Sequence, residues 1–521
     1  MKEVLFSLLI FLFVLQACDG PTASPGDSPK YGDEVLTSRS TYLEARDALV
    51  KADQAAYQSG NLKLSPIEQA LNEKLVALRK RENDAYKAAH DFPPANHFYR
   101  AKSKIEASPL FSFFRAMPKG ALLHVHPPAM GSADWIAEQV LEADDCYVSW
   151  EGFDETHVRG EIRFFKEGEA AAGFVPARQL QQQLPALRDS IVHWLTFDEW
   201  VTAPAVDHWK VFEERFQRLA GFVFYAPMIK AFYRHAFESM VATGIQHVEL
   251  RKTYVFTPYD LEHEPGYFNP DSSIRWFQEV VAEVQEKSPH FSANLIYTSL
   301  RFFDAATIRK ELVQAFELKQ KYPEVIRGFD LVAEEDAGRA TQYFLDVWLS
   351  LDSLEKEYGV EMPFFMHGGE SDWTSLDNLY DLSLLPVKRI GHGFNLIRFP
   401  SLVDEIIEKD ICLEISPLSN QILGYVRDLR IHPGSYCLAQ GVPISISSDD
   451  PLIFNYDGLA YDFWSVFMAW ELDLPKLKQL VKNSLTYSAL PSEAKASALA
   501  YWEKEWAAFV TAANENLPII P

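Results

Sequence analysis

The sequence predicts an α/β protein whose main domain is a (β/α)8 TIM barrel. The chain has 521 residues, enough for a barrel of about 250 residues together with attached elements. Hydrophobic residues make up 48% and charged residues 23%, which is the balance of a folded globular protein. Beyond Met117, short apolar runs alternate eight times with longer segments of helical periodicity. Such runs are typical of parallel strands buried on both faces, and eight of them favour closure into a barrel.

The first residues predict export. The apolar run from Val4 to Leu15 has the length of a signal-peptide core and is too short to span a bilayer. The run ends in Leu-Gln-Ala-Cys18, which resembles the bacterial lipobox, where the cysteine becomes the lipidated first residue. Gln16 is unusual there, so a conventional cut is the alternative. We expect a signal peptide over residues 1–18 and a protein that is secreted or lipid-anchored at the outer side of the membrane.

A flexible tether and a helical region are expected next. Residues 19–33 are rich in Pro, Gly, Ser and Asp and cannot bury enough apolar surface to fold. Residues 34–115 form the expected N-terminal helical region, because apolar and charged positions alternate at helical spacing and Leu71, Leu75 and Leu78 share one face. Such helices pack either on their own barrel or on a second subunit, and the sequence leaves both open.

The barrel is expected over residues 116–515, with an insertion. About a hundred residues separate the first two strands, which predicts a small inserted lobe at about 140–200 with strand-like pieces at 146–150 and 162–165. Helices are expected between the strands, for example over 305–321 and 342–358. The eight strands are expected near Ala121–His126, Ile245–Arg251, Ala293–Arg301, Val325–Ala333, Met362–His367, Lys388–His392, Ile411–Ser416 and Val442–Ser448.

Charge and cysteine content exclude some classes of protein. The formal net charge is -24, with 73 acidic against 49 basic residues, so the surface repels phosphate backbones and nucleic acid is not an expected partner. The four cysteines form no CxxC pair, and lipidation of Cys18 would leave the odd number Cys146, Cys412 and Cys437. A disulfide framework is therefore not expected.

Candidate metal ligands lie where several strands end, which is where barrel enzymes place their sites. His124 and His126 are two residues apart in an extended strand, so both imidazoles point to the same face. His367 ends the fifth strand and Asp449 follows the eighth. Three histidines and an aspartate suit one zinc ion per subunit, which lowers the pKa of a bound water to about 7. The pattern predicts hydrolysis or hydrolytic deamination.

Candidate proton-transfer groups stand at the same strand ends. Glu370 follows His367 after two glycines, which permit a tight turn. His392 lies between two further glycines, and Asp450 stands next to Asp449, followed by a proline. Each of these residues, taken alone, is also common at strand ends and in turns for structural reasons. Their joint occurrence at four strand ends favours a catalytic site.

These motifs resemble those of the adenosine deaminases, and most closely the extracellular growth-factor type, within the metal-dependent hydrolase superfamily. The resemblance extends over nearly the whole mature chain, including Phe92-Pro93-Pro94 and Tyr225-Ala226-Pro227. The motifs that carry it are MPKGALLHVH (117–126), HGGE (367–370), RIGHGF (389–394), SPLSNQ (416–421) and ISSDDP (446–451).

The resemblance implies a site, a reaction and an assembly. Zinc would be held by His124, His126, His367 and Asp449. Glu370 would protonate the purine ring nitrogen, His392 would orient the attacking water and stabilise its charge, and Asp450 would accept from the other side of the ring. Trp209 falls near the nucleoside. Adenosine or a related purine nucleoside would give inosine, or its analogue, and ammonia, and the N-terminal helices would form a homodimer.

Two positions depart from the family pattern. The family has an aspartate after its HxH that helps to hold the ribose, whereas this chain has Pro127-Pro128, which offer neither a carboxylate nor a backbone donor. The family has glycine where Ala333 stands, which lets its backbone approach the purine, and we expect the added methyl group to crowd or tilt the base. These departures leave the preferred nucleoside open. Cys146 is the one cysteine that could match the disulfide of the family's inserted lobe, so receptor binding by this lobe is not expected.

Two alternatives remain. One is a hydrolase of the same superfamily that acts on another aminopurine or on an amide. The other is a non-catalytic extracellular binding protein, against which stand Glu370 and His392, since a binder needs neither. The cytidine-deaminase type of zinc enzyme is excluded because the chain lacks a PCxxC motif.

Overall fold

The computed structural model describes residues 38–150, 158–198 and 207–517, and the chain divides into two compact units, Met1–Ala55 and Ala56–Pro521. The predicted signal peptide, Cys18 and the tether lie outside the described residues. The first unit contributes helix α1 (Arg39–Ala56), whose Tyr42, Leu43, Leu49 and Val50 side chains are exposed. Among the described helices, none combines the length and the apolar character that crossing a membrane requires.

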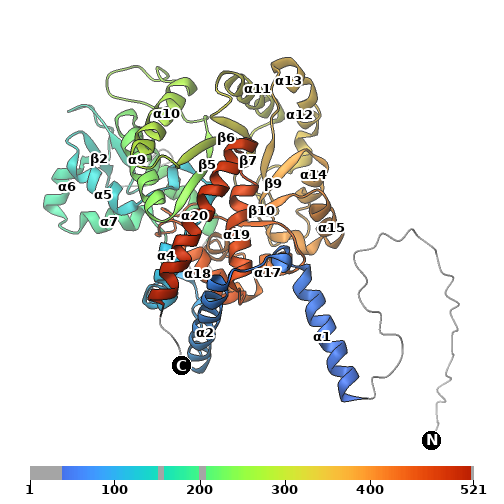
Figure 1. Cartoon of the computed structure of the whole chain (residues 1–521). Helices are drawn as coiled ribbons and strands as arrows, with labels where there is room; N and C mark the ends of the chain where they lie inside the picture. The colour runs from blue at the N-terminus through green and yellow to red at the C-terminus, as the bar shows by residue number, and fades with distance from the viewer. Residues whose placement is uncertain (1–37, 151–157, 199–206, 518–521) are drawn as a thin grey trace, which may run out of the picture. The chain divides into compact units, whose positions relative to one another are not determined.

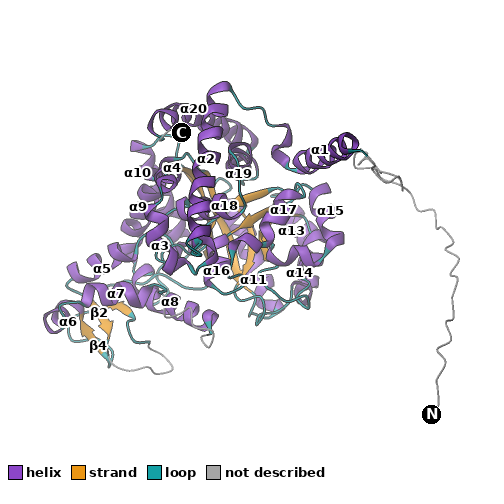
Figure 2. Cartoon of the chain, turned by 90° about the horizontal axis from the view of Figure 1, so that it is seen from below, coloured by secondary structure: helices purple, strands orange, loops and turns teal. Residues whose placement is uncertain are grey.

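The second unit is built around an eight-stranded parallel sheet with the order β1-β5-β6-β7-β8-β9-β10-β11. A parallel bridge between Val125 and Asp449 joins the last strand to the first, so the sheet closes into a barrel. Helices surround the strands (Figure 2), and the predicted TIM barrel is confirmed. Each strand lies at one of the eight predicted places: β1 (Gly120–Val125), β5 (Ile245–Thr253), β6 (Ser292–Leu300), β7 (Ile326–Val332), β8 (Phe364–Gly368), β9 (Val387–His392), β10 (Cys412–Ile415) and β11 (Ile444–Ile446).

Most helices begin with recognisable signals. Asn269 and Asp304 cap α10 (Pro270–Lys287) and α11 (Ala305–Lys321) through side-chain oxygens that accept backbone N–H bonds. The α11 bounds are those predicted. The other barrel helices are α9 (Ala226–Ala242), α14 (Asn378–Leu384), α15 (Pro400–Glu408), α16 (Pro417–Ile422), α17 (Pro433–Ala439), α18 (Ala460–Ala469), α19 (Leu474–Thr486) and α20 (Ser492–Asn516), with short 3-10 turns η3 (Pro127–Ala129), η6 (Phe394–Arg398) and η7 (Leu429–Ile431).

The prediction of a helix over 342–358 is wrong in one respect, because the helical segment is interrupted. It forms η5 (Thr341–Phe344), α12 (Leu345–Trp348) and α13 (Leu351–Tyr358). At the break, the Ser350 hydroxyl donates to the Val347 carbonyl oxygen and the Trp348 indole donates to that of Thr341. These side-chain bonds compete with the regular helical pattern and so permit the interruption.

Helix α2 (Pro66–Ala88) packs on the barrel of its own chain. Ser65 and Glu68 form a capping box at its first turn, with Pro66 at the first helical position. Leu71, Leu75 and Leu78, the face seen in the sequence, are fully buried. After this helix the chain continues through η2 (Pro93–Ala95), α3 (Phe98–Ala107) and α4 (Pro109–Ala116) into the first strand. The division at residues 115 and 116 stays a prediction.

The segment between β1 and β5 carries a small lobe, seen beside α5, α6 and α7 in Figure 1. It holds a three-stranded antiparallel sheet of β2 (Cys146–Ser149), β3 (Ile162–Phe164) and β4 (Phe174–Pro176), in the order β3-β2-β4. The first two strands are the pieces expected from sequence. The lobe is completed by α5 (Ala133–Glu142), α6 (Ala177–Gln183) and α7 (Leu187–Leu195), and α8 (His208–Val223) follows. The described cysteines Cys146, Cys412 and Cys437 are buried and free.

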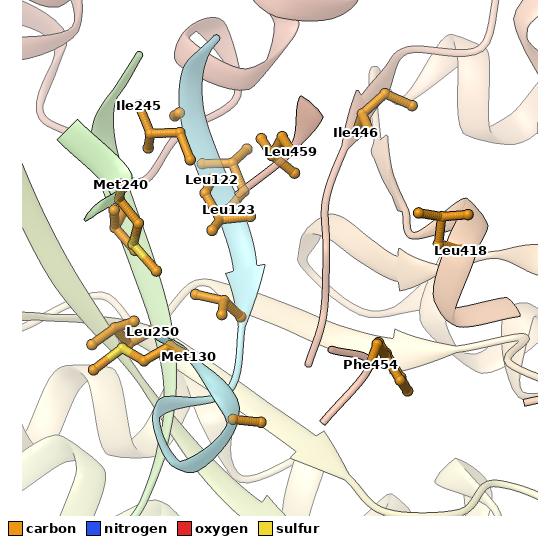
Figure 3. Packing of buried hydrophobic residues seen from close by; sticks show 14 of the residues in the cluster. Leu122, Leu123, Met130, Met240, Ile245, Leu250, Leu418, Ile446, Phe454 and Leu459 are labelled. Atoms are coloured by element: carbon orange, nitrogen blue, oxygen red, sulfur yellow. The ribbon is translucent and has the colours of Figure 1, made fainter. Parts of the chain in front are cut away.

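The core fixes the strands that carry the site. Leu122 and Leu123 are adjacent in β1 and both are fully buried, as expected of a parallel strand covered on both faces. Figure 3 shows them beside Ile245 and Leu250 of β5, the strand with which β1 pairs. Packing on both faces holds β1 rigidly, and its last residues carry the first candidate ligands.

Candidate active site

The four predicted metal ligands, together with His392, gather at one end of the barrel. Ligand atoms of His124, His367, His392 and Asp449 all lie within 4.8 Å of one another, and the same holds for His126, Asp449 and Asp450. Asp449 Oδ1 is 3.4 Å from His124 Nε2 and 3.3 Å from His126 Nε2. Residues up to 325 positions apart in the sequence therefore meet at one point.

The barrel closure places Asp449. Its backbone N–H donates to the His124 carbonyl oxygen at 3.2 Å, and its carbonyl oxygen accepts from His126 N–H at 3.3 Å. Asp449 and His392 both adopt φ +64°, a left-handed conformation that costs a non-glycine residue about 1–3 kcal/mol and that clusters at functional sites. The Ser419 hydroxyl donates to Asp449 Oδ2 at 2.8 Å. Oδ1 is thereby left facing the histidines.

The donor set fits a divalent metal ion. Two ligands of a tetrahedral zinc ion, each bound at about 2.0–2.1 Å, lie about 3.3–3.4 Å apart. The contacts of Asp449 Oδ1 with the two histidines have this length. His124 Nε2 is buried and has no hydrogen-bond partner among the described residues. Since buried polar atoms are normally satisfied, this nitrogen is suited to ligation.

Two buried carboxylates orient the histidines. Glu414 Oε2 is 2.9 Å from His124 Nδ1, and Asp330 Oδ2 is 2.8 Å from His367 Nδ1. A carboxylate that accepts from Nδ1–H fixes the tautomer in which Nε2 carries the lone pair, as in many metal sites. Burial disfavours ionisation of Asp330, but His367 and Arg251 outweigh it and hold the pKa of that carboxyl below its ordinary value. Neither Asp330 nor Glu414 is among the residues predicted from the sequence, although each is a lone acid in an apolar strand.

Fully buried arginines hold these carboxylates in place. Arg251 contacts Glu414 and approaches Asp330 Oδ2 at 3.6 Å, and Arg389 bridges Glu414 and Glu249. Burial acts against the charged Glu414, yet the two arginines keep its pKa well below the ordinary range. Both guanidinium groups are therefore committed to the barrel interior, and the network was not foreseen from sequence.

Glu370 and His392 stand beside the metal ligands. The Glu335 carboxylate accepts from the backbone N–H groups of Gly369 and Glu370, at 3.0 and 2.6 Å, and so fixes the turn that presents the Glu370 side chain. His392 Nε2 is 3.6 Å from Glu370 Oε2 and 4.0 Å from Asp449 Oδ2. Burial, followed by the charge of Asp449, raises the pKa of Glu370 well above its ordinary value.

A cavity of about 330 Å³ opens onto this cluster. Its wall includes the three residues predicted to contact substrate, Asp450, Trp209 and Ala333. The Trp209 indole donates to the Tyr425 hydroxyl at 2.8 Å, and Asp450 is 2% exposed with Oδ1 unpartnered among the described residues. Ala333 has φ +87°, the left-handed region that glycine adopts without strain. Pro128, which stands near the position of the family's aspartate, lines the same cavity.

Comparison with known sequences identifies the family. The family model described as "Adenosine deaminase" matches residues 175–501, and that described as "Adenosine/AMP deaminase N-terminal" matches residues 13–114. Adenosine deaminase 2-A of Danio rerio is 34% identical over 485 residues, which cover 89% of this chain and 93% of the relative. Adenosine deaminase 2 of Homo sapiens is 32% identical, with coverage of 90% and 93%, and an adenosine deaminase of Lutzomyia longipalpis is 31% identical, with coverage of 91% and 94%.

Solved structures share the fold at lower identity. An adenine deaminase from Arthrobacter aurescens has a TM-score of 0.52 at 18% identity and covers 74% of this chain and 98% of its own. The N6-methyl-AMP deaminase of Arabidopsis thaliana has a TM-score of 0.54 at 14% identity, with coverage of 76% and 98%. An amidohydrolase from Burkholderia ambifaria, solved with bound Zn, has a TM-score of 0.55 at 15% identity, with coverage of 78% and 95%. With its barrel, its histidine and aspartate cluster and these matches, the chain belongs to the adenosine deaminase family, hydrolytic enzymes that act on purine C–N bonds.

Proposed function

We propose that this protein catalyses the zinc-dependent hydrolytic deamination of a purine nucleoside, adenosine or a close relative, to the 6-oxo product and ammonia. The observation that carries the proposal is the convergence of His124, His126, His367 and Asp449 at one end of a cavity that also holds Glu370 and His392. One zinc ion per subunit would be held by the first four residues. Their nitrogen and oxygen donors are those that zinc prefers.

The ion would supply Lewis acidity that makes water nucleophilic at neutral pH. His392 lies within reach of both Asp449 and Glu370, which supports a role in which it would orient the attacking water and take up its proton. Glu370 would donate a proton to the ring nitrogen next to the attacked carbon. Asp450 faces the cavity on the other side of the ring, where the purine nitrogen carries no hydrogen, so Asp450 would act as a donor rather than an acceptor; burial and the charge of Asp449 raise the pKa of its carboxyl and favour this form. One water enters and the C–N bond to the amino group breaks. Of the two protons of the water, one ends on the ring nitrogen and the other on the departing amino group, which leaves as ammonia.

The buried setting supports these roles. Glu370 and His392 are 3% and 1% exposed, so both act where little water competes for the same hydrogen bonds. Glu335, Asp330 and Glu414 act through other residues and are positioning residues. Preorganised groups of this kind lower the cost of reorganisation during the reaction.

The place of action and the assembly are proposed from the sequence. The apolar run at Val4–Leu15 supports export, and Cys18 supports lipid anchoring at the outer side of the membrane. A homodimer formed through the N-terminal helices rests on the family resemblance. Light scattering of the purified mature chain tests the assembly, since a monomer mass would contradict it.

A steady-state assay of the purified, zinc-loaded protein tests the reaction. Adenosine, 2′-deoxyadenosine and substituted aminopurine nucleosides are incubated with the enzyme. Ammonia release is measured together with the decrease in ultraviolet absorbance of the aminopurine. Glu370→Gln keeps the shape of the side chain but removes the proton donor, so kcat should fall by about 10²–10⁴-fold. Release of no ammonia from any purine by protein that contains zinc would contradict the proposal, and turnover of an amide would support the other hydrolase.

A further inference from the structure

We propose that the part of the cavity remote from the metal ligands is an apolar subsite that accepts a non-polar substituent on the sugar side of the nucleoside and rejects a phosphate. The inference rests on the proposed function, which sets the orientation of the substrate. It goes beyond it by naming the chemical class of nucleoside that the cavity favours.

The topology separates the cavity into two ends. The candidate ligands and His392 lie at the ends of β1, β8, β9 and β11, whereas most of the remaining wall comes from α8 and from the ends of β5, β6 and β7. These three strands lie between β1 and β8 in the sheet, so the cavity extends across the barrel mouth away from β9 and β11. The sugar of a purine nucleoside is attached to the five-membered ring, away from the amino-bearing carbon. With that carbon at the ligands, the sugar enters the remote end.

The wall of the remote end is largely apolar. Phe212, Phe216 and Ala220 are four residues apart on α8 and present one face of that helix to the cavity, whose wall also includes Leu300 and Val332 of the strands. The two threonines of this wall are already engaged: the Thr298 hydroxyl donates to Ile296 O at 3.0 Å, and Thr253 Oγ1 accepts from Val255 N–H at 3.3 Å. The side chains of Glu213 and Gln217, on the same helix, are the polar groups of this wall that remain for the hydroxyl groups of a sugar.

Among the described residues, the cavity wall offers no free cation to a phosphate. Arg251 is the one lysine or arginine that the described part of the chain contributes to this wall, and its side chain is fully buried against Glu414 and Asp330. Burial raises the pKa of Glu334, and repulsion from Glu213 raises it further. Glu213 stands on the α8 side of the wall, so the two carboxylates lie near each other. A phosphate entering here would meet carboxylates and no unpaired positive charge, which disfavours nucleotides.

Two aromatic side chains at the cavity edge remain uncovered. Phe256, after β5, is 51% exposed, and Phe302, after β6, is 44% exposed, although both contribute to the wall. Exposed apolar side chains beside a cavity mark surface that a ligand can cover. Each methylene group of a substituent buried here would strengthen binding by about fourfold.

The test compares adenosine with analogues changed only at the 5′ position. The zinc-loaded protein is assayed with adenosine, 5′-deoxyadenosine, 5′-deoxy-5′-methylthioadenosine and adenosine 5′-phosphate. We expect kcat/KM for the methylthio compound to exceed that for adenosine about tenfold or more, and the phosphate to fall about 100-fold below adenosine. Equal kcat/KM values for adenosine and the methylthio compound, or efficient turnover of the phosphate, would overturn the inference while leaving the proposed deamination intact.

A binding measurement and a variant complete the test. Calorimetry with inosine and 5′-deoxy-5′-methylthioinosine gives the same comparison without turnover, so the inference is decided even if no nucleoside is deaminated. Phe302→Asn should reduce the preference for the methylthio compound by about fivefold or more in both assays. Leu349→Asn, at a 69% exposed leucine outside the cavity wall, is the matched control and should leave the preference unchanged. An unchanged preference in Phe302→Asn would count against the subsite.

Discussion

Replacement of Asp330 by asparagine should weaken metal binding by reversing the tautomer of His367. Asp330 Oδ1 accepts from the backbone N–H groups of Leu331 and His367, at 2.7 and 2.9 Å, and Oδ2 accepts from His367 Nδ1 at 2.8 Å. In Asp330→Asn the amide group should turn its oxygen toward the two backbone N–H groups, because each of these hydrogen bonds contributes about 1 kcal/mol. The amide NH2 then faces Nδ1, which must become the acceptor. The ring proton moves to Nε2, the nitrogen that the proposed metal needs.

The expected loss is 10- to 100-fold in zinc affinity, the range for a lost partner of a metal-bound histidine, or about 1.4–2.7 kcal/mol. Competition with a chromophoric chelator measures the dissociation constant, and thermal unfolding of the metal-free protein measures stability separately. Glu68→Gln is the matched control, because Glu68 is also a buried carboxylate but pairs with Lys478, outside the network that supports the metal ligands. That control should lower stability and leave zinc affinity within about twofold. Zinc binding by Asp330→Asn within about twofold of the wild type would refute the tautomer argument.

Three further predictions concern stability. Glu68→Gln removes a buried carboxylate that pairs with Lys478 at 2.8 Å and should cost about 3 kcal/mol at pH 7, measured by urea unfolding; a loss below about 1 kcal/mol would contradict this. Burial opposes ionisation of Glu68, but Lys478 and further hydrogen bonds lower its pKa to about 2. The contribution of Glu68 to stability should therefore hold above pH 4.5 and fade as the pH falls toward 2. Plots of unfolding free energy against pH for the wild type and the variant should converge at low pH. Ala333→Gly should leave stability unchanged or raise it by about 1–2 kcal/mol, because glycine relieves the backbone strain of φ +87°. Its control, Ala507→Gly on the exposed face of α20, should lose about 1 kcal/mol. Equal losses in the two variants would argue against strain at Ala333. Removal of zinc by a chelator should lower Tm, and zinc at about 1,000 times its Kd should restore about 4 kcal/mol, so a Tm insensitive to metal would contradict a site of this affinity.

The strand ends of the barrel were predictable because their chemistry is local. His124, His126, His367 and His392 each follow a short apolar run, and a parallel barrel brings the carboxyl ends of its strands to one face. The same rule placed Asp449, although its left-handed backbone was not foreseen. Periodicity was therefore sufficient to place the candidate ligands together.

The partners of these residues depend on register and were not predictable. Glu414 meets His124 across 290 positions of sequence, and an acid within an apolar strand gives no indication of which side chain it will face. Strand β4 (Phe174–Pro176) ends in a proline, a residue that argues against a strand when only the sequence is known. Helix α8 shows an apolar face containing Phe212 and Phe216, but periodicity does not distinguish a face that covers a core from one that lines a cavity.

The position of the metal in a crystal of the zinc-loaded protein tests the central claim most directly. Anomalous diffraction recorded at the zinc absorption edge should give one strong peak per chain, about 2.0–2.2 Å from a nitrogen of His124, His126 and His367 and from an oxygen of Asp449. A peak held by other residues, or no peak at this end of the cavity in protein that releases ammonia from a nucleoside, would contradict the account.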